Sequence, residues 1–339
     1  MMKEALLYNK LDNKRVKCNV CQIGCVVPEG RRGACRTRLN KDCTFYTLIY
    51  SKVSSIHSDP IEKKPLYHFY PGTSCLSLGT LGCNFHCPGC QNWQISQSNV
   101  DLDQVNLMDV TPEESVRLIE ESGCKGISWT YNEPAIWFEY TLDGARLAKE
   151  KGLYTVYVTN GYMTTQALDT IGPYLDAFRV DIKGFSRESY KKITGLSRFE
   201  GILDVTARAK KKWGMHVEVI TNVTPTINDS DQMLQSIASW IAGSLGPDVP
   251  WHVTRFHPYL NLSHIPPTPI ETLERAREIG IKEGLNYVYI GNVSGHPGED
   301  TYCPGCKMMI IKRDGFCISE YHIKDGACQY CGKVISGRF

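Results

Sequence analysis

The sequence has no hydrophobic run that approaches the ~18 apolar residues of a membrane-spanning helix. Its first residues reach Lys3 and Glu4 at once, so we expect no secretory signal peptide. It also has almost no excess charge, because 38 basic and 36 acidic residues leave a net charge of +2. So weak a field attracts neither nucleic acid nor an acidic membrane. These absences predict a cytoplasmic protein with no membrane partner, and they disfavour nucleic acid as a partner.

One segment lacks charge altogether. No Asp, Glu, Lys or Arg occurs from Pro65 to Val100, and the segment is rich in Gly, Ser, Asn and Gln. Three cysteines, Cys83, Cys87 and Cys90, lie in the middle of it. A neutral segment with many turn residues suits a site that is shielded from water, although a chance gap over a buried strand and loop would give the same pattern.

Cysteine, in contrast, is abundant, with 15 residues in a chain of 339. That share is below the ~8–10% of small disulfide scaffolds, and a chain of this length can bury a sufficient core without cross-links. In a reducing compartment, clustered cysteines are usually metal ligands. Four C-x-x-C pairs, which begin at Cys18, Cys87, Cys303 and Cys328, have the spacing of such ligands.

Strand-like and helix-like segments alternate through the middle of the chain at the spacing of βα units. The expected strands are Ser74–Thr80, Gly126–Trp129, Tyr154–Thr159, Phe178–Ile182, His216–Val223, Trp251–Phe256 and Tyr287–Ile290. Two Thr-Pro-x-Glu sequences, at Thr111 and Thr268, predict helix starts with capping boxes. Gly123 and Gly152 follow helical patterns where a left-handed C-cap is expected.

These patterns predict an α/β fold with three parts. A cysteine-rich N-terminal metal-binding segment (1–73) precedes a partial (β/α)6 TIM-like barrel (74–300), and a small zinc-ribbon-like C-terminal module (301–339) follows it. So short a tail cannot bury much core, so we expect a metal ion to organise it.

The motif Cys83-x3-Cys87-x2-Cys90 directly follows the first barrel strand. Three thiolates on one loop can hold three irons of a [4Fe–4S] cluster, and the fourth iron then keeps the exchangeable position that catalysis requires. A zinc knuckle or a redox dithiol is the alternative. The tetrapeptide Cys-Pro-Gly-Cys recurs at Cys303, so this sequence alone does not identify a cluster. The place of the loop at the C-terminal end of a barrel strand favours the cluster.

This loop on a partial barrel resembles the signature of radical S-adenosylmethionine (SAM) enzymes, in particular the pyruvate formate-lyase activating enzyme group. Residues 59–69 and 289–293 also resemble the radical SAM enzymes of the AmmeMemoRadiSam system. The resemblance implies that the cluster cleaves SAM reductively to a 5′-deoxyadenosyl radical, which abstracts hydrogen from a protein or peptide substrate. It makes Cys83, Cys87 and Cys90 the catalytic ligands and a ferredoxin or flavodoxin the low-potential electron donor.

The resemblance also implies which residues contact SAM, each after a different barrel strand. They are Tyr131, Asn132, Glu133 and Asn160 near the methionine end, Asp181 and Lys183 at the ribose and carboxylate, and His257 at the adenosine end. Taken alone, the Asp181–Lys183 pair could be an ordinary ion pair and His257 a loop histidine. The aromatic residue that usually precedes the third cysteine is replaced by Gly89, which leaves Phe85 or Trp93 to contact the adenine.

The flanking cysteines predict further metal sites. Cys303, Cys306, Cys328 and Cys331 are expected to hold structural Zn²⁺. The N-terminal set, Cys18, Cys21, Cys25 and Cys35, suits zinc or an auxiliary iron–sulfur cluster, with a slight preference for zinc. The remaining four, Cys43, Cys75, Cys124 and Cys317, are predicted to be small buried core residues.

Two other functions stay open at this point. A radical enzyme could modify RNA or a small metabolite, although Lys210-Lys211-Lys212 is the one local basic run and suits a solvated helix face. A zinc-ribbon binding module without enzymatic activity is the second alternative.

Overall fold

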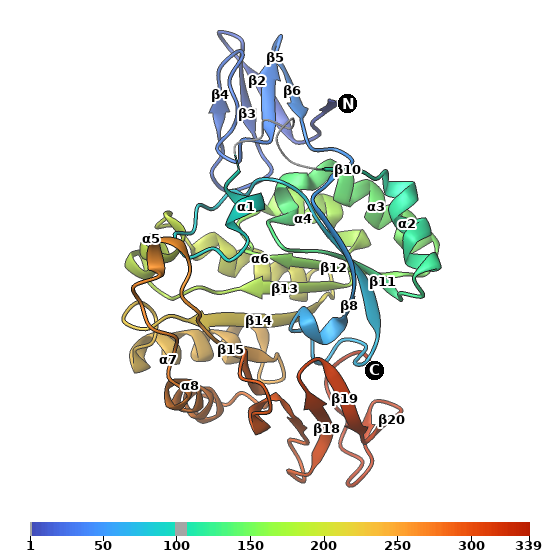
Figure 1. Ribbon diagram of the computed structural model, residues 1–339, viewed down its shortest axis with the longest axis vertical. Helices are drawn as coiled ribbons and strands as arrows, with labels where there is room; N and C mark the ends of the chain where they lie inside the picture. The colour runs from blue at the N-terminus through green and yellow to red at the C-terminus, as the bar shows by residue number, and fades with distance from the viewer. Residues whose placement is uncertain (1, 99–106) are drawn as a thin grey trace.

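The computed structural model describes residues 2–98 and 107–339, and its centre is an eight-stranded sheet (Figure 1). Along the sheet the strands are β8 (Ser55–Pro60), β9 (Ser74–Gly79), β11 (Gly126–Trp129), β12 (Tyr154–Thr159), β13 (Ala177–Asp181), β14 (His216–Val223), β15 (Trp251–Arg255) and β16 (Val288–Gly291). All neighbours from β9 to β16 are parallel. The seven expected strands are therefore present, and the predicted α/β partial barrel is confirmed.

Strand β8 was not expected. It pairs antiparallel with β9 at the edge of the sheet, with Asp59 opposite Cys75. Its sequence, Ser-Ile-His-Ser-Asp-Pro, is too polar for a central strand, and a proline at its end is tolerated because the strand lies at an edge. The strand precedes residue 74, where the barrel was expected to begin, and the proposed domain boundaries stay a prediction.

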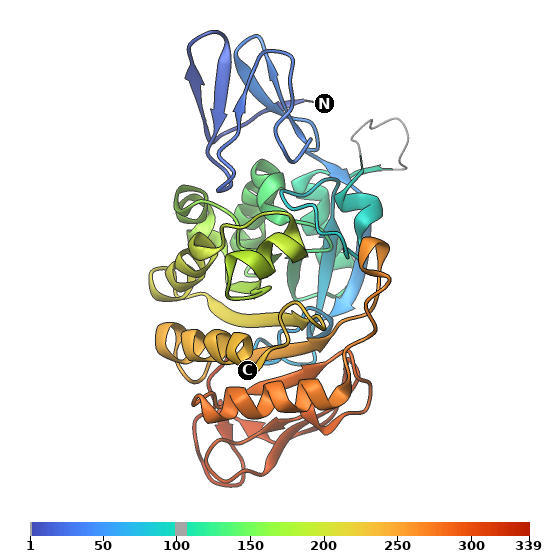
Figure 2. The same cartoon turned by 90° about the vertical axis from the view of Figure 1, so that its left-hand side faces the viewer.

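The connecting helices cover the outer side of the sheet, as right-handed crossovers require (Figure 2). They are α2 (Pro112–Glu121), α3 (Phe138–Glu150), α4 (Thr165–Ile171), α5 (Arg187–Thr194), α6 (Glu200–Lys211), α7 (Asp231–Trp240) and α8 (Ile270–Lys282), and the short α1 (Trp93–Ser96) lies in the loop after β9. Buried apolar residues on one face of each long helix pack against the strands.

The predicted helix ends are confirmed in three cases and wrong in one. Thr111 caps α2, since its hydroxyl accepts from the Glu114 N–H (3.2 Å) and the Glu114 carboxylate accepts from the Thr111 N–H (2.7 Å). Gly123 and Gly152 have the expected left-handed φ angles of 69° and 70°. Thr268 does not cap α8. Its buried hydroxyl instead donates to the Val223 carbonyl (2.6 Å) and accepts from the Phe256 N–H (2.8 Å), so it joins the ends of two barrel strands.

The N-terminal segment forms two small three-stranded sheets above the barrel (Figure 1). Their strands are β1 (Lys3–Glu4), β2 (Tyr8–Leu11), β3 (Arg15–Cys18), β4 (Val26–Val27), β5 (Arg38–Lys41) and β6 (Thr44–Thr47), and β7 (Lys52–Val53) then pairs with β10 (Met108–Asp109). Arg38 on β5 and Glu139 on α3 are both buried and lie 2.7 Å apart. This ion pair and the shared apolar core join the segment to the barrel.

The C-terminal module lies at the opposite end (Figure 1). It contains β17 (Thr301–Tyr302), β18 (Met309–Asp314), β19 (Cys317–Tyr321), β20 (Ile323–Lys324) and β21 (Ala327–Cys328). Its isoleucines share a buried cluster with Tyr67, Tyr287 and Tyr289 of the barrel side. A metal ion is therefore not the sole organiser of the tail, because apolar contacts with the barrel also stabilise it.

Candidate functional site

The loop that contains Cys83, Cys87 and Cys90 follows β9 at the C-terminal end of the sheet, as expected. The three thiols are half-buried. Burial raises the pKa of Cys83 well above its usual value, and the neighbouring Glu133 and the other two thiols raise it further. Burial likewise raises the pKa of Cys87 to about 11. Thiolates so close together need a cationic partner, which a metal cluster provides.

Donors around the loop point toward sulfur. The Phe85 N–H donates to Cys83 Sγ (3.4 Å), and Cys90 Sγ lies 3.2 Å from the Ser96 hydroxyl. The Asn84 side-chain nitrogen is buried and has no hydrogen-bond partner among the described residues. A donor without an acceptor beside three thiols fits a sulfur-rich group at this position. The residues present therefore fit an iron–sulfur cluster.

The N-terminal segment packs directly against this loop at Gly82. Gly82 has a φ of +83°, and a Cβ atom there would lie 2.4 Å from Thr37 Cγ2 and 2.8 Å from the Cys35 carbonyl oxygen. Only glycine accommodates both the left-handed backbone and the close approach. The position of Cys83 thus depends on contact with the N-terminal segment.

We expect Gly82→Ala to destabilise the protein and to reduce its iron content. Gly284→Ala is the matched control, because Gly284 also has a positive φ (+94°) and a Cβ there would have nothing within 4 Å. The backbone conformation alone should cost about 1–2 kcal/mol in both variants, and only Gly82→Ala adds the overlap. Urea unfolding and iron analysis compare the two variants, and equal losses would contradict the assigned contact.

Glu133 and Asn160 meet next to the loop, although they follow different strands. Glu133 is buried, and its two oxygens accept from the Thr159 hydroxyl (2.7 Å) and the Asn160 N–H (2.8 Å). Burial raises the pKa of Glu133 to about 7, against the effect of these donors. The Asn160 side chain donates to Asn84 Oδ1 (2.8 Å) and lies 3.9 Å from Cys83 Sγ. The structure therefore brings both residues to the cysteine loop.

Tyr131 and Asn132 lie beside the loop, and both side chains have partners within the protein. The Tyr131 hydroxyl donates to Asp59 Oδ2 (2.7 Å), and the residue has a φ of +72°. Asn132 donates to the Gly82 carbonyl (2.7 Å) and accepts from the Thr80 N–H (3.2 Å). Both residues hold the backbone around the loop in place, and their contact with SAM stays a prediction.

Asp181 and Lys183 lie at the end of β13. Asp181 accepts from Arg179 (2.7 Å) and Lys183 (3.2 Å), so the ion pair considered from the sequence is present. The Lys183 ammonium also acts on Cys87, whose pKa it lowers against the effect of burial. His257 is half-buried just after β15, which ends at Arg255. A lysine beside the loop offers a cationic group with which a carboxylate ligand could pair.

Leu262 was not expected to take part in the site. A Cβ atom at Gly89 would lie 2.8 Å from Leu262 Cδ1, and the Asn261 N–H donates to the Pro88 carbonyl (3.0 Å). In the resembling enzymes an aromatic side chain usually stands just before the third cysteine. Here Leu262, from the loop after β15, fills that space beside Gly89 instead. Nothing in the sequence near Gly89 could have indicated this, since the contact spans distant segments.

The two aromatic candidates for an adenine contact differ in exposure. Phe85 is buried and packs against Tyr162, with ring centroids 5.2 Å apart. Trp93 on α1 is 42% exposed. Of the two rings, only that of Trp93 is open to a ligand from solvent.

The C-terminal thiols converge closely. The ligand atoms of Cys303, Cys306, Cys328 and Cys331 all lie within 4.8 Å of one another. Two of the sulfur–sulfur distances are 3.6 Å and 3.8 Å. A tetrahedral zinc site with Zn–S bonds of ~2.3 Å places its sulfurs ~3.8 Å apart. The four thiols could therefore hold one metal ion.

The remaining four cysteines differ in exposure. Cys75 and Cys124 are buried, as predicted, whereas Cys43 is only half-buried, against the prediction, and Cys317 is exposed. The prediction for Cys317 is wrong because the module is too thin to cover both faces of β19, whose residues alternate between exposed and half-buried positions.

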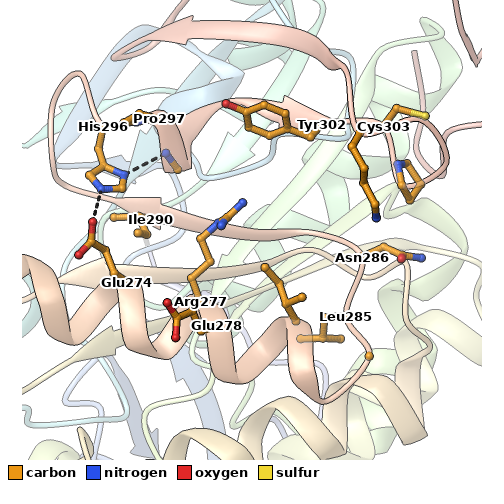
Figure 3. A pocket seen from close by; sticks show the side chains of 15 residues that line it. Glu274, Arg277, Glu278, Leu285, Asn286, Ile290, His296, Pro297, Tyr302 and Cys303 are labelled. Atoms are coloured by element: carbon orange, nitrogen blue, oxygen red, sulfur yellow. Dashed lines mark hydrogen bonds and ion pairs between the residues drawn. The ribbon is translucent and has the colours of Figure 1, made fainter. Parts of the chain in front are cut away.

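A separate cavity of about 880 Å³ lies between α8 and the start of the C-terminal module (Figure 3). Its lining includes Arg277, Lys307 and His296, and the His296 ring lies 3.4 Å from Glu274 Oε1. Apart from Cys303, no predicted site residue lines it. In the described part of the chain, no helix is both long and apolar enough to cross a membrane.

Comparison with known proteins agrees with the cysteine loop. The family model of the radical SAM superfamily matches residues 78–241, which include the loop and the ends of the strands beside it. The chain belongs to the radical SAM superfamily. Membership implies a [4Fe–4S] cluster and SAM as cofactors and a radical SAM mechanism.

Relatives of this radical SAM enzyme include both long and partial matches. An uncharacterised protein of Methanocaldococcus jannaschii is 44% identical over 98% of this chain and 99% of its own length. The pyruvate formate-lyase-activating enzyme of Clostridium pasteurianum is 25% identical over 54% of this chain and 78% of its own length. The crystal structure of Streptococcus suis SuiB bound to S-adenosylmethionine has a TM-score of 0.50 at 12% identity, covering 68% of this chain and 52% of that one, which supports the fold alone.

Proposed function

We propose that this radical SAM enzyme abstracts a hydrogen atom from a protein or peptide substrate, with Cys83, Cys87 and Cys90 as the ligands of its [4Fe–4S] cluster. When bound, the cluster supplies the electron that cleaves SAM. The observation that supports the assignment most is the convergence of polar residues from three different strand ends on one three-cysteine loop. Parallel strands place their C-terminal ends at one edge, where such folds perform chemistry.

The chain's own residues bind and orient SAM in this proposal. The Glu133 carboxylate accepts a hydrogen bond from the methionine amino group, and Asn160 fixes Asn84 beside Cys83. The Lys183 ammonium pairs with the methionine carboxylate, and Asp181 orients that lysine and accepts from a ribose hydroxyl. His257 and Trp93 face the adenosine end.

The proposal of a protein substrate rests on the activating-enzyme relatives. The name of the pyruvate formate-lyase-activating enzyme states a protein partner for that relative. A ferredoxin or flavodoxin is the proposed electron donor, and Zn²⁺ is the proposed ion of the C-terminal thiols because the sulfur spacing matches its bond length.

Deuterium tracing tests the substrate class. The anaerobically purified, reconstituted enzyme is incubated with SAM, dithionite and deuterated candidates, beginning with proteins encoded nearby, and 5′-deoxyadenosine is analysed by mass spectrometry. We expect deuterium to enter it from a protein or peptide. Transfer only from RNA or a small metabolite would replace the proposed substrate class, and a colourless protein that binds zinc alone would exclude the radical mechanism.

We expect Lys183→Met to weaken SAM binding about 10- to 100-fold, because a hydrogen bond to a charged group contributes ~1.5–3 kcal/mol. Lys192→Met is the control, since Lys192 is exposed and pairs only along its own helix with Glu188 (2.8 Å). Equilibrium binding of SAM to both reconstituted variants distinguishes them. Unchanged affinity in Lys183→Met would contradict the proposed role.

A further inference from the structure

The N-terminal cysteines surround a small cavity between the two sheets and the barrel. The four thiols come from β3, from the turns after it and from the turn before β5. The cavity is lined by Cys18, Val20, Cys21, Ile23, Cys25, Gly33, Cys35, Arg38, Phe45 and Ile136. Apart from the thiols and one arginine, the lining is thus apolar or glycine, and Cys18 and Cys21 are buried in it while Cys25 and Cys35 are half-buried at its edge.

Two of the four thiols receive a hydrogen bond from a nearby donor. The Ala34 N–H donates to Cys25 Sγ (3.4 Å), and the Thr37 hydroxyl donates to Cys35 Sγ (3.2 Å). A backbone N–H likewise donates to Cys83 in the catalytic loop and to Cys303 in the C-terminal set. Donors aimed at sulfur stabilise thiolates that bind a metal.

The spacing of these thiols differs from that of the C-terminal set. A single zinc ion draws four sulfurs to ~3.8 Å from one another, as the C-terminal thiols show. Within residues 2–98 and 107–339, the C-terminal set is the one group of three or more such ligand atoms placed to hold a metal ion, and its atoms all lie within 4.8 Å of one another. The N-terminal sulfurs stand around a cavity instead, as they do when several irons and sulfides lie between them.

Arg38 supplies the second indication of a ligand. Its side chain is 1% exposed, its two terminal nitrogens bind Glu139, and it lines the cavity. Its Nε–H is buried and has no hydrogen-bond partner among the described residues. A buried donor without an acceptor is costly. Bridging sulfides of a cluster are acceptors, whereas a lone zinc ion is not, and the guanidinium also offsets the negative charge of a thiolate-bound cluster.

We propose that Cys18, Cys21, Cys25 and Cys35 bind a second iron–sulfur cluster rather than zinc. The site shares a wall with the catalytic loop, since the Cys35 carbonyl and Thr37 are the atoms that approach Gly82 most closely. The cluster therefore lies immediately beside the loop of Cys83. The inference does not depend on the substrate class proposed above.

The test uses the full-length chain in which Cys83, Cys87 and Cys90 are all alanine. We expect this triple variant to stay brown after anaerobic reconstitution, with near-equal iron and sulfide and a Mössbauer spectrum of an iron–sulfur cluster. Adding Cys18→Ala should remove this iron. Adding Cys43→Ala, the matched control, should retain it, because Cys43 lies in the same segment but outside the cavity.

A triple variant with no iron and two zinc ions per chain would overturn the inference. The wild-type protein gives a second measurement if the triple variant does not fold: two clusters correspond to about six to eight irons per chain, and one [4Fe–4S] cluster to about four. About four irons in the wild type would likewise overturn it. Because the triple variant cannot cleave SAM by design, its iron content tests the N-terminal site alone, and failure of the proposed function would appear separately in the wild type.

Discussion

Replacement of Cys87 by alanine is expected to reduce the formation of 5′-deoxyadenosine from SAM to background. A loop that holds three irons through three thiolates cannot retain an open fourth position once one thiolate is lost. Cys87 is also the thiol whose pKa Lys183 lowers against the effect of burial, so the substitution removes a group that this lysine acts on. The measurement is anaerobic turnover with dithionite and SAM, followed by chromatography of the nucleoside product.

Cys75→Ala is the matched control for this variant. Cys75 lies on β9, the strand that leads into the loop, and is fully buried on the side away from the three thiols, next to Tyr154 and Ala177. Its substitution should cost some stability but should leave SAM cleavage intact. If Cys87→Ala still cleaved SAM, the loop would have no part in the mechanism, whatever the family membership implies.

The sequence predicted those parts of the fold that depend on local patterns. All seven parallel strands were expected from their apolar runs, since strands buried on both faces lack polar alternation. Thr111 could be assigned as a cap because its partner Glu114 is three residues away. Thr268 has the same local sequence, yet its hydroxyl binds a strand end brought close only by the fold. Local motifs therefore indicate what a residue can do, and tertiary contacts decide among the options.

The candidate site was predictable in its chemistry but not in its supporting contacts. Cysteine spacing located the loop, and the resemblance to radical SAM enzymes, supported by positions at strand ends, indicated Glu133, Asn160 and Lys183. The packing of Leu262 on Gly89 and of Thr37 on Gly82 joins segments far apart in the chain, and no spacing rule describes it. The bond between Tyr131 and Asp59 was missed because it depends on the unexpected strand β8.

Replacement of Cys328 by serine is expected to remove the proposed Zn²⁺ site of the C-terminal module and to unfold that module locally. Structural zinc contributes an apparent ~10–16 kcal/mol in zinc-finger peptides, more than the small apolar cluster around Ile310 and Ile311 can replace. Cys317→Ser is the control, since Cys317 lies in the same module and is exposed. Metal analysis and limited proteolysis after residue 300 compare the two variants. Full metal content and full protection in Cys328→Ser would contradict the assignment.

The same variant should leave SAM cleavage nearly unchanged. The module contacts Tyr67 and residues near the start of β16, such as Tyr289, whereas the cysteine loop follows the end of β9. Because β9 and β16 run in the same direction in one parallel sheet, the start of one and the end of the other lie on opposite sides of the barrel. Unfolding of the module would break the contact of Arg313 with the Tyr67 ring (4.0 Å to the ring centre), which lies on the side of the barrel remote from the cysteine loop. A large loss of SAM cleavage in Cys328→Ser would instead mean that the folding of the module affects the cysteine loop at the other side of the sheet.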